Sequence, residues 1–145
     1  MEYYKELRKY VGHRPLILPG SVVIIQNEKG EILLQERTPN VFGLPGGLMD
    51  LGESLEDTAI REVYEETNLK VENLELVHVF SGPDYFFKLD NGDEFYSVTA
   101  VYKTSSYHGE LIANLNESVQ LLFVDIDKLP EGIIRSHKKF LETCL

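Results

Sequence analysis

Residues 47–69 read GLMDLGESLEDTAIREVYEETNL, a Gly-rich turn followed by one acidic helix. Ser54 is suited to cap the start of that helix and, with Asp57 three residues later, it predicts a capping box. Asn68 tolerates a left-handed backbone, which predicts a stop directly after the last helical turn. The stretch therefore predicts a helix from Ser54 to about Thr67.

Three carboxylates lie on one face of this helix. Because each residue advances about 100° around a helix, Glu62, Glu65 and Glu66 share an arc of about 100°. Like charges at this spacing repel one another, and the negative end of the helix dipole lies close by. A bound divalent cation would remove this conflict, whereas a solvated acidic face, the usual role of a Glu-rich helix, would leave it in place.

The order of these residues resembles the Nudix box, whose pattern is Gly, five residues, Glu, seven residues, Arg-Glu-apolar-x-Glu-Glu-x-Gly-apolar. Eight of nine defined positions match, and chance agreement at the six matched Gly, Glu and Arg positions is on the order of 10⁻⁷ per starting position. The departure is Asn68 in place of the usual Gly, and Asn is the next-best residue for a left-handed helix end. The preceding Leu44-Pro45-Gly46-Gly47 is also similar to the family.

The rest of the chain predicts strands packed with helices. Runs suited to strands stand at 21–26, 31–36, 74–87, 95–104 and 119–125, and helical spacing stands at 2–11 and 132–145. The resemblance implies an α/β fold, the Nudix-type α/β/α sandwich with a mixed β-sheet. Because no repeat or linker divides residues 1–145, we expect a single domain.

The composition narrows the class of protein further. With 43% hydrophobic residues a real core is expected, and no apolar run is long enough to span a membrane. The 24 acidic residues outnumber the 14 basic ones, and this argues against nucleic acid as a partner. The charged N-terminus and the single Cys144 favour a cytoplasmic protein.

The resemblance implies a role for each box residue. Glu62, Glu65 and Glu66 match the family's Mg²⁺ ligands, with the Gly46 carbonyl as a further oxygen. These are hard oxygen donors, for which Mn²⁺ is expected to substitute.

The implied reaction is attack of water on one phosphorus of a P–O–P bridge in a small-molecule nucleotide, which makes the chain a Nudix pyrophosphohydrolase. Arg61 and Glu53 match the pair that braces the loop against the helix. The proton acceptor is left open between Glu62 and Glu117, a loop residue before the last strand whose other interpretation is a solvated acid.

Two residues outside the box bear on the substrate. Tyr85 lies 16 residues after Leu69, an offset typical of members that cleave dinucleoside polyphosphates. This substrate is therefore slightly favoured, although ordinary strand packing also explains Tyr85. Pro83 lies near the offset typical of ADP-ribose members, and a nucleoside triphosphate also stays open. Arg37, close in sequence to the Gly-rich turn, is suited to hold a phosphate oxygen.

Two further questions stay open. A Nudix-fold sensor that binds a nucleotide without cutting it is the alternative to an enzyme, but such modules commonly lose box glutamates. Homodimers are common in such families, and the N-terminal segment up to Val11 offers an interface.

Overall fold

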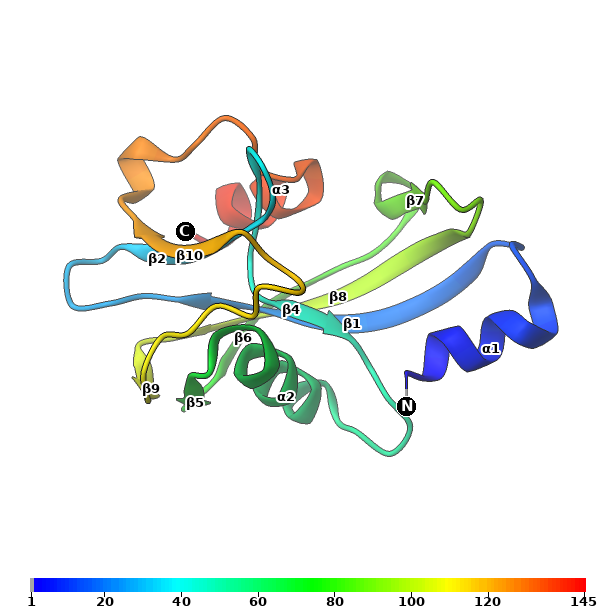
Figure 1. Cartoon of the computed structure of the whole chain (residues 1–145), viewed down its shortest axis with the longest axis horizontal. Helices are drawn as coiled ribbons and strands as arrows, with labels where there is room; N and C mark the ends of the chain where they lie inside the picture. The colour runs from blue at the N-terminus through cyan, green and yellow to red at the C-terminus, as the bar shows by residue number, and fades with distance from the viewer. Residues whose placement is uncertain (1) are drawn as a thin grey trace.

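The computed structural model describes residues 2–145 (Figure 1). The helices are α1 (Tyr3–Val11), α2 (Leu55–Thr67) and α3 (Arg135–Cys144), with short 3₁₀ helices η1 (Pro83–Tyr85) and η2 (Ile126–Lys128). The strands are β1 (Leu16–Ile25), β2 (Ile32–Thr38), β3 (Val41–Gly43), β4 (Gly46–Leu48), β5 (Lys70–Glu72), β6 (Glu75–Phe80), β7 (Phe86–Lys88), β8 (Glu94–Thr104), β9 (Ser106–His108) and β10 (Gln120–Val124).

The central sheet is mixed, as the resemblance implied. Its strands follow the order β4-β1-β8-β6, and β7 also pairs with β8. β1 and β8 run parallel, whereas β4, β6 and β7 pair antiparallel with their neighbours. Smaller sheets are formed by β10-β2-β3 and by β5-β9. Figure 1 shows α2 and α3 on opposite sides of the central strands, so the predicted α/β/α sandwich is confirmed.

Both faces of β1 are buried, and each face supports a different helix. Val22 and Ile24 belong to the hydrophobic cluster that includes Phe140 of α3. Val23 belongs to the cluster that includes Val63 of α2. Because side chains alternate along a strand, one continuous apolar run holds a helix on each side of the sheet. This packing fixes α2, which carries the box carboxylates, against the strand beside the Gly-rich turn.

One predicted strand was wrong in its middle. The run 74–87 contains β6, then η1, then β7, because Gly82 has a φ of 109° and Pro83 follows it. A positive φ suits glycine, and proline cannot donate to a strand ladder, so the two residues together turn the chain. The three-residue strands β3, β4, β5 and β9 were not predicted, since such short strands carry no readable alternation.

Both ends of α2 follow the sequence prediction. Ser54 Oγ accepts a hydrogen bond from the Asp57 amide at 2.9 Å, and the Asp57 carboxylate accepts one from the Ser54 amide at 3.1 Å. Asn68 adopts the left-handed conformation with a φ of 65°. Among residues 2–145, no helix is long and apolar enough to cross a bilayer.

The capping box gives a first testable prediction. Ser54→Ala should destabilise the protein by about 1 kcal/mol, because the Asp57 amide at the start of α2 loses its hydrogen-bond acceptor. In thermal unfolding this corresponds to a midpoint about 2–4 °C lower for a chain of this size. Ser54→Asp, which can also cap, should retain most of the stability, and an equal loss in both variants would contradict the capping role.

Candidate active site

Gly46 and Gly47, the last residues of the Gly-rich turn and the first of β4, bring this segment against both β1 and α2. A Cβ atom on Gly46 would overlap the backbone of Ser21 and Val22. A Cβ atom on Gly47 would overlap the carboxyl group of Glu62. The absence of side chains at both positions therefore lets backbone, strand and acidic helix meet at one place.

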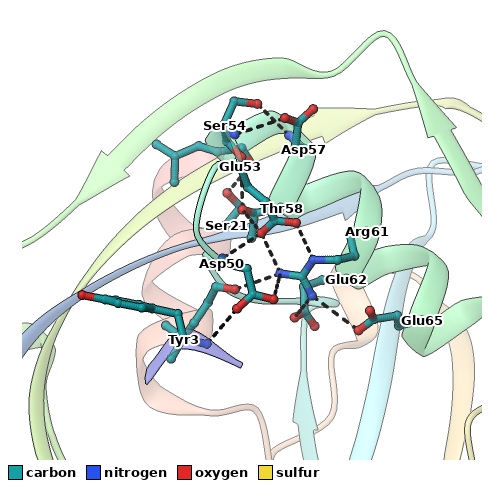
Figure 2. Close-up of polar contacts among 12 residues, drawn as sticks. Tyr3, Ser21, Asp50, Glu53, Ser54, Asp57, Thr58, Arg61, Glu62 and Glu65 are labelled. Atoms are coloured by element: carbon teal, nitrogen blue, oxygen red, sulfur yellow. Dashed lines mark hydrogen bonds and ion pairs between the residues drawn. The ribbon is translucent and has the colours of Figure 1, made fainter. Parts of the chain in front are cut away.

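Arg61 joins the loop to the helix through a two-pronged ion pair (Figure 2). Its Nε donates to Glu53 Oε2 at 2.5 Å, and its Nη2 donates to Glu53 Oε1 at 2.9 Å. Nη2 also donates to the Leu48 carbonyl at 3.1 Å. The hydrogen bond from Arg61 lowers the pKa of Glu53 to about 2. The structure thus brings together the two residues that the resemblance assigned to bracing.

Glu62 and Glu66 form an acidic pair at the Gly-rich turn. Glu62 Oε1 accepts a hydrogen bond from Arg61 Nη1 at 2.7 Å, and Glu66 Oε1 accepts one from the Gly46 amide at 3.1 Å. Glu66 is only 4% exposed, and burial raises its pKa to about 8, with the neighbouring charge of Glu62 adding to the rise and Arg37 opposing it. Burial also raises the pKa of Glu62 against the opposing effect of Arg61.

Glu65 lies apart from this pair. Its side chain is 51% exposed, and its Oε2 lies 3.5 Å from Arg61 Nη1. Figure 2 shows Glu65 reaching toward Arg61 from the side. Within residues 2–145, no three His, Cys, Asp or Glu side chains converge into a ready-made cation cage. Two of the three carboxylates predicted as ligands are therefore adjacent, and the third is turned toward Arg61.

A cavity of about 370 Å³ opens beside the Gly-rich turn. Part of its wall is aromatic, because Phe87 and Phe95 stack with ring centroids 5.2 Å apart and planes 21° apart. Ser97 and Thr99 of β8 add hydroxyl groups, and Gly46 joins the cavity to the acidic pair. The cavity thus combines stacking surface and polar groups next to carboxylates.

Two nitrogen-bearing side chains line the same cavity. Arg37 Nη2 donates to the Leu44 carbonyl at 2.9 Å, while its buried Nε has no hydrogen-bond partner within residues 2–145. His137 Nδ1 accepts a hydrogen bond from the Leu44 amide at 2.9 Å, so its proton is on Nε2. Burial, with the nearby charge of Arg37, lowers the pKa of His137 to about 3. His137 is therefore a fixed neutral donor at neutral pH.

Tyr85 does not fit its predicted role. It is 5% exposed and packs in the core against Phe80 and Phe140, with ring centroids 5.8 Å and 6.0 Å away. It is absent from the cavity wall among the described residues. The stacking of a base on Tyr85 is therefore corrected to core packing, because η1 turns its ring inward.

Glu117 lies on the surface in a turn before β10. No side-chain hydrogen bond or ion pair in the described chain joins it to the box. Its charge does act on Lys5 of α1, whose pKa it helps to raise after the larger effects of Glu2 and Tyr4. Within residues 2–145, the structure shows no side-chain contact between Glu117 and Glu62, the other proton acceptor considered.

Sequence reasoning missed most of the cavity wall. Phe95, Ser97 and Thr99 alternate along β8 and share one face, so the period-two pattern of this strand carried the signal. No sequence pattern indicated His137, because its place in the cavity wall depends on how α3 packs across the sheet.

Comparison with known proteins agrees with this geometry. The model of the NUDIX domain matches residues 17–144. An ADP-ribose pyrophosphatase from Methanocaldococcus jannaschii is 30% identical over 144 residues, covering 95% of this chain and 78% of that protein. A Bacillus subtilis protein provisionally named 8-oxo-dGTP diphosphatase is 31% identical over 121 residues, covering 83% of this chain and 74% of that protein.

Solved structures show the same likeness. The crystal structure of a MutT NUDIX hydrolase from Burkholderia pseudomallei superposes with a TM-score of 0.75 and 28% identity, covering 89% of this chain and 98% of that one. A MutT protein from Methanosarcina mazei Go1, at 24% identity and a TM-score of 0.73, shares the fold. Since the family model spans nearly the whole chain and the box geometry is in place, this chain belongs to the Nudix hydrolase family.

Proposed function

We propose that this Nudix pyrophosphohydrolase uses Mg²⁺ to hydrolyse the pyrophosphate bond of a nucleoside diphosphate linked to another group. The observation that carries the proposal is the acidic pair Glu62 and Glu66, set at the Gly-rich turn beside a cavity of nucleoside size. The relatives' names give different substrates, ADP-ribose and 8-oxo-dGTP, which share a nucleoside diphosphate unit. The preference for dinucleoside polyphosphates rested on Tyr85 and has lost that support.

The donor set at the turn suits a hard divalent cation. Glu62 and Glu66 present carboxylate oxygens whose ionised forms are disfavoured by burial, so a nearby positive charge would stabilise both. Glu65 would join them by leaving Arg61, and the Gly46 carbonyl would add an oxygen. When bound, Mg²⁺ offsets charge on phosphate oxygens and lowers the pKa of the attacking water, and Mn²⁺ can supply the same chemistry.

The protein's own groups divide the remaining work. Glu62 is our preferred proton acceptor because it lies at the turn, whereas Glu117 is exposed and, within residues 2–145, makes no side-chain contact with the box. Arg61 and Glu53 hold the loop so that Glu62 keeps its orientation. Arg37, in the cavity wall, has a buried Nε that finds no hydrogen-bond partner among the described residues, and a phosphate oxygen would complete its hydrogen bonding.

The cavity is suited to hold the nucleoside. The stacked rings of Phe87 and Phe95 offer an aromatic wall for a base, and the hydroxyls of Ser97 and Thr99 can donate or accept. His137 can only donate, which favours a base or sugar that presents an acceptor to it.

A substitution in the aromatic wall tests this assignment. Phe95→Ala should raise KM for the preferred nucleotide about tenfold and change kcat less than about twofold, because stacking on a base is worth roughly 1–2 kcal/mol in binding. The matched control is Tyr96→Ala, since Tyr96 is the next residue on β8 and packs instead against Phe86 at 5.1 Å. Equal changes in KM for both variants would show that the nucleoside does not bind in this cavity.

The function itself is tested by product release with and without Mg²⁺. The assay compares ADP-ribose, sugar nucleotides, diadenosine polyphosphates and oxidised nucleoside triphosphates, and chromatography identifies the bond that is cut. We expect metal-dependent turnover of at least one class, abolished by a chelator. Nucleotide binding without any turnover would instead support the alternative function, a Nudix-fold sensor that binds a nucleotide without cutting it.

Two broader expectations belong to the same proposal. We expect the protein to act in the cytoplasm, where small nucleotides are available. We also expect it to form a homodimer of the kind common in such families. Light scattering on the full chain measures the mass of the particle in solution. A monomeric mass at micromolar concentration would exclude the homodimer.

A further inference from the structure

Helix α1 lies outside the part of the chain that matches the family model, which begins at residue 17. It nevertheless reaches the active-site loop. In Figure 1 the first turn of α1 lies near the loop that follows β4, and the rest of the helix leads away from it. The additional helix α1 is therefore in a position to affect the geometry of the box.

The far end of α1 is fixed to the central sheet by Arg8. Its guanidinium donates to the carbonyls of Gly12 and Arg14, at 3.0 Å and 2.6 Å, and to the carbonyl of Glu94 in β8 at 2.6 Å. Arg8 Nε also lies 3.7 Å from Asp93, which accepts a second contact from His13 at 2.7 Å. This end of the helix is held by several partners, so the position of its first turn is defined by the fold.

The near end of α1 is capped from the active-site loop. Glu2, the local N-cap residue, makes no side-chain cap hydrogen bond. Instead the amide of Tyr3 donates to Asp50 Oδ1 at 2.8 Å, as Figure 2 shows. A carboxylate at a helix N-terminus satisfies a free amide and complements the positive end of the helix dipole. Asp50 therefore joins a distant helix to the loop between Gly47 and Glu53.

Asp50 in turn contacts the brace. Its Oδ2 lies 3.9 Å from Arg61 Nη2, and its amide donates to Glu53 Oε1 at 2.8 Å. The first turn of α1 also borders Glu62 directly, because Tyr4 shares a small hollow with Arg61 and Glu62. Contacts thus run without interruption from α1 through Asp50 to the guanidinium that holds Glu62.

We propose that Asp50 is a positioning residue, and that α1 sets its orientation and thereby the orientation of Arg61 toward Glu62. Asp50 occupies one of the undefined positions of the box, so the box pattern assigns it no role. The inference rests on the proposed function for its kinetic consequences. Its structural content, an arginine geometry that depends on a helix amide, is independent of the substrate.

The decisive variant removes only the amide donor. Tyr3→Pro eliminates the N–H group at the first helical position, where proline is well tolerated, and Tyr3→Ala is the matched control because it removes the same side chain and keeps the amide. We expect Tyr3→Pro to lower kcat about fivefold relative to Tyr3→Ala, with KM within about twofold, as suits loss of one hydrogen bond to a charged group. Equal kcat values in the two variants would overturn the proposal.

Two further measurements separate this inference from the function it rests on. In nitrogen-15 NMR of the metal-free protein, the Arg61 Nε–H signal, assigned by its loss in Arg61→Lys, should shift in Tyr3→Pro and stay in place in Tyr3→Ala. In a double-mutant cycle, Tyr3→Pro combined with Asp50→Ala should be no slower than Asp50→Ala alone, whereas additive losses would show that the residues act separately. Absence of turnover in the wild type would reject the proposed function, and the NMR comparison would still decide the inference.

Discussion

Glu66→Gln should lower kcat by about 1,000-fold while raising the thermal stability of the metal-free protein. The loss of activity follows from the proposed cation site, because a neutral amide in place of a buried carboxylate holds Mg²⁺ weakly. A bound cation supplies several kcal/mol of transition-state stabilisation, and about 4 kcal/mol corresponds to three decades in rate. The nearly isosteric side chain keeps the fold.

The gain in stability follows from the pKa of Glu66. Burial raises it from the ordinary 4.5 to about 8, so the folded protein binds this proton more tightly than the unfolded chain does. A carboxyl group of this kind favours the folded state below pH 4.5, and that advantage is lost as the pH rises through about 8. Gln does not ionise, so we expect Glu66→Gln to be about 1–2 kcal/mol more stable near pH 8, or about 3–6 °C in the unfolding midpoint.

The measurement is thermal unfolding from pH 5 to pH 9, with a chelator and then with Mg²⁺. Mg²⁺ should stabilise the wild type and leave Glu66→Gln nearly unchanged. Glu65→Gln is the control, since its side chain is half exposed and should not produce the pH-dependent gain in the chelated protein. A fully active, well-folded Glu66→Gln protein would exclude Glu66 as a metal ligand.

Arg61→Lys should cost about 2 kcal/mol of stability and about 100-fold in kcat. Lysine keeps the charge but cannot reproduce the fork that bonds both oxygens of Glu53 and reaches Glu62 and the Leu48 carbonyl as well. Both members of the ion pair are largely shielded, with Arg61 27% and Glu53 16% exposed, so the loss exceeds that of a surface pair. The unfolding midpoint should fall by about 4–8 °C.

The dependence of protein stability on acid pH provides a second test of the ion pair between Arg61 and Glu53. The hydrogen bond from Arg61 lowers the pKa of Glu53 from 4.5 to about 2, so its stabilising effect is complete above pH 4.5 and disappears as the pH falls toward 2. In Arg61→Lys the pKa of Glu53 should return toward its ordinary value, so the variant should lose less stability than the wild type as the pH falls below about 4.5. Urea unfolding between pH 3 and pH 7 tests this, and parallel profiles for the two proteins would contradict the assigned role of the pair.

The box segment could be predicted from the sequence almost residue by residue. The capping box at Ser54, the left-handed stop at Asn68 and the neighbouring pair Glu62 and Glu66 all depend on neighbours within one or two helical turns. Such local geometry is fixed by spacing, so the sequence pattern was sufficient. The family and its sandwich followed from the same residues.

The rest of the site depends on contacts between distant segments. The pairing of Asp50 with Tyr3 joins positions that no local pattern connects, and the hydrogen bond from the Leu44 amide to His137 joins the Gly-rich turn to the last helix. Tyr85 shows the opposite error, since its distance along the chain matched a functional offset while its ring packs inward. Sequence distance does not determine which face of the fold receives a side chain.

The parallel pairing of β1 with β8 has a consequence for synthesis of the protein. Leu16 pairs with Phe95 and Ile25 with Thr104, so the two central strands come from opposite halves of the chain. A ribosome must therefore synthesise the chain through β8 before the middle of the sheet can form. Until then β1, which is apolar on both faces, can pair only with the short strand β4. Long-range pairing of this kind makes folding slow and the nascent chain dependent on protection from aggregation.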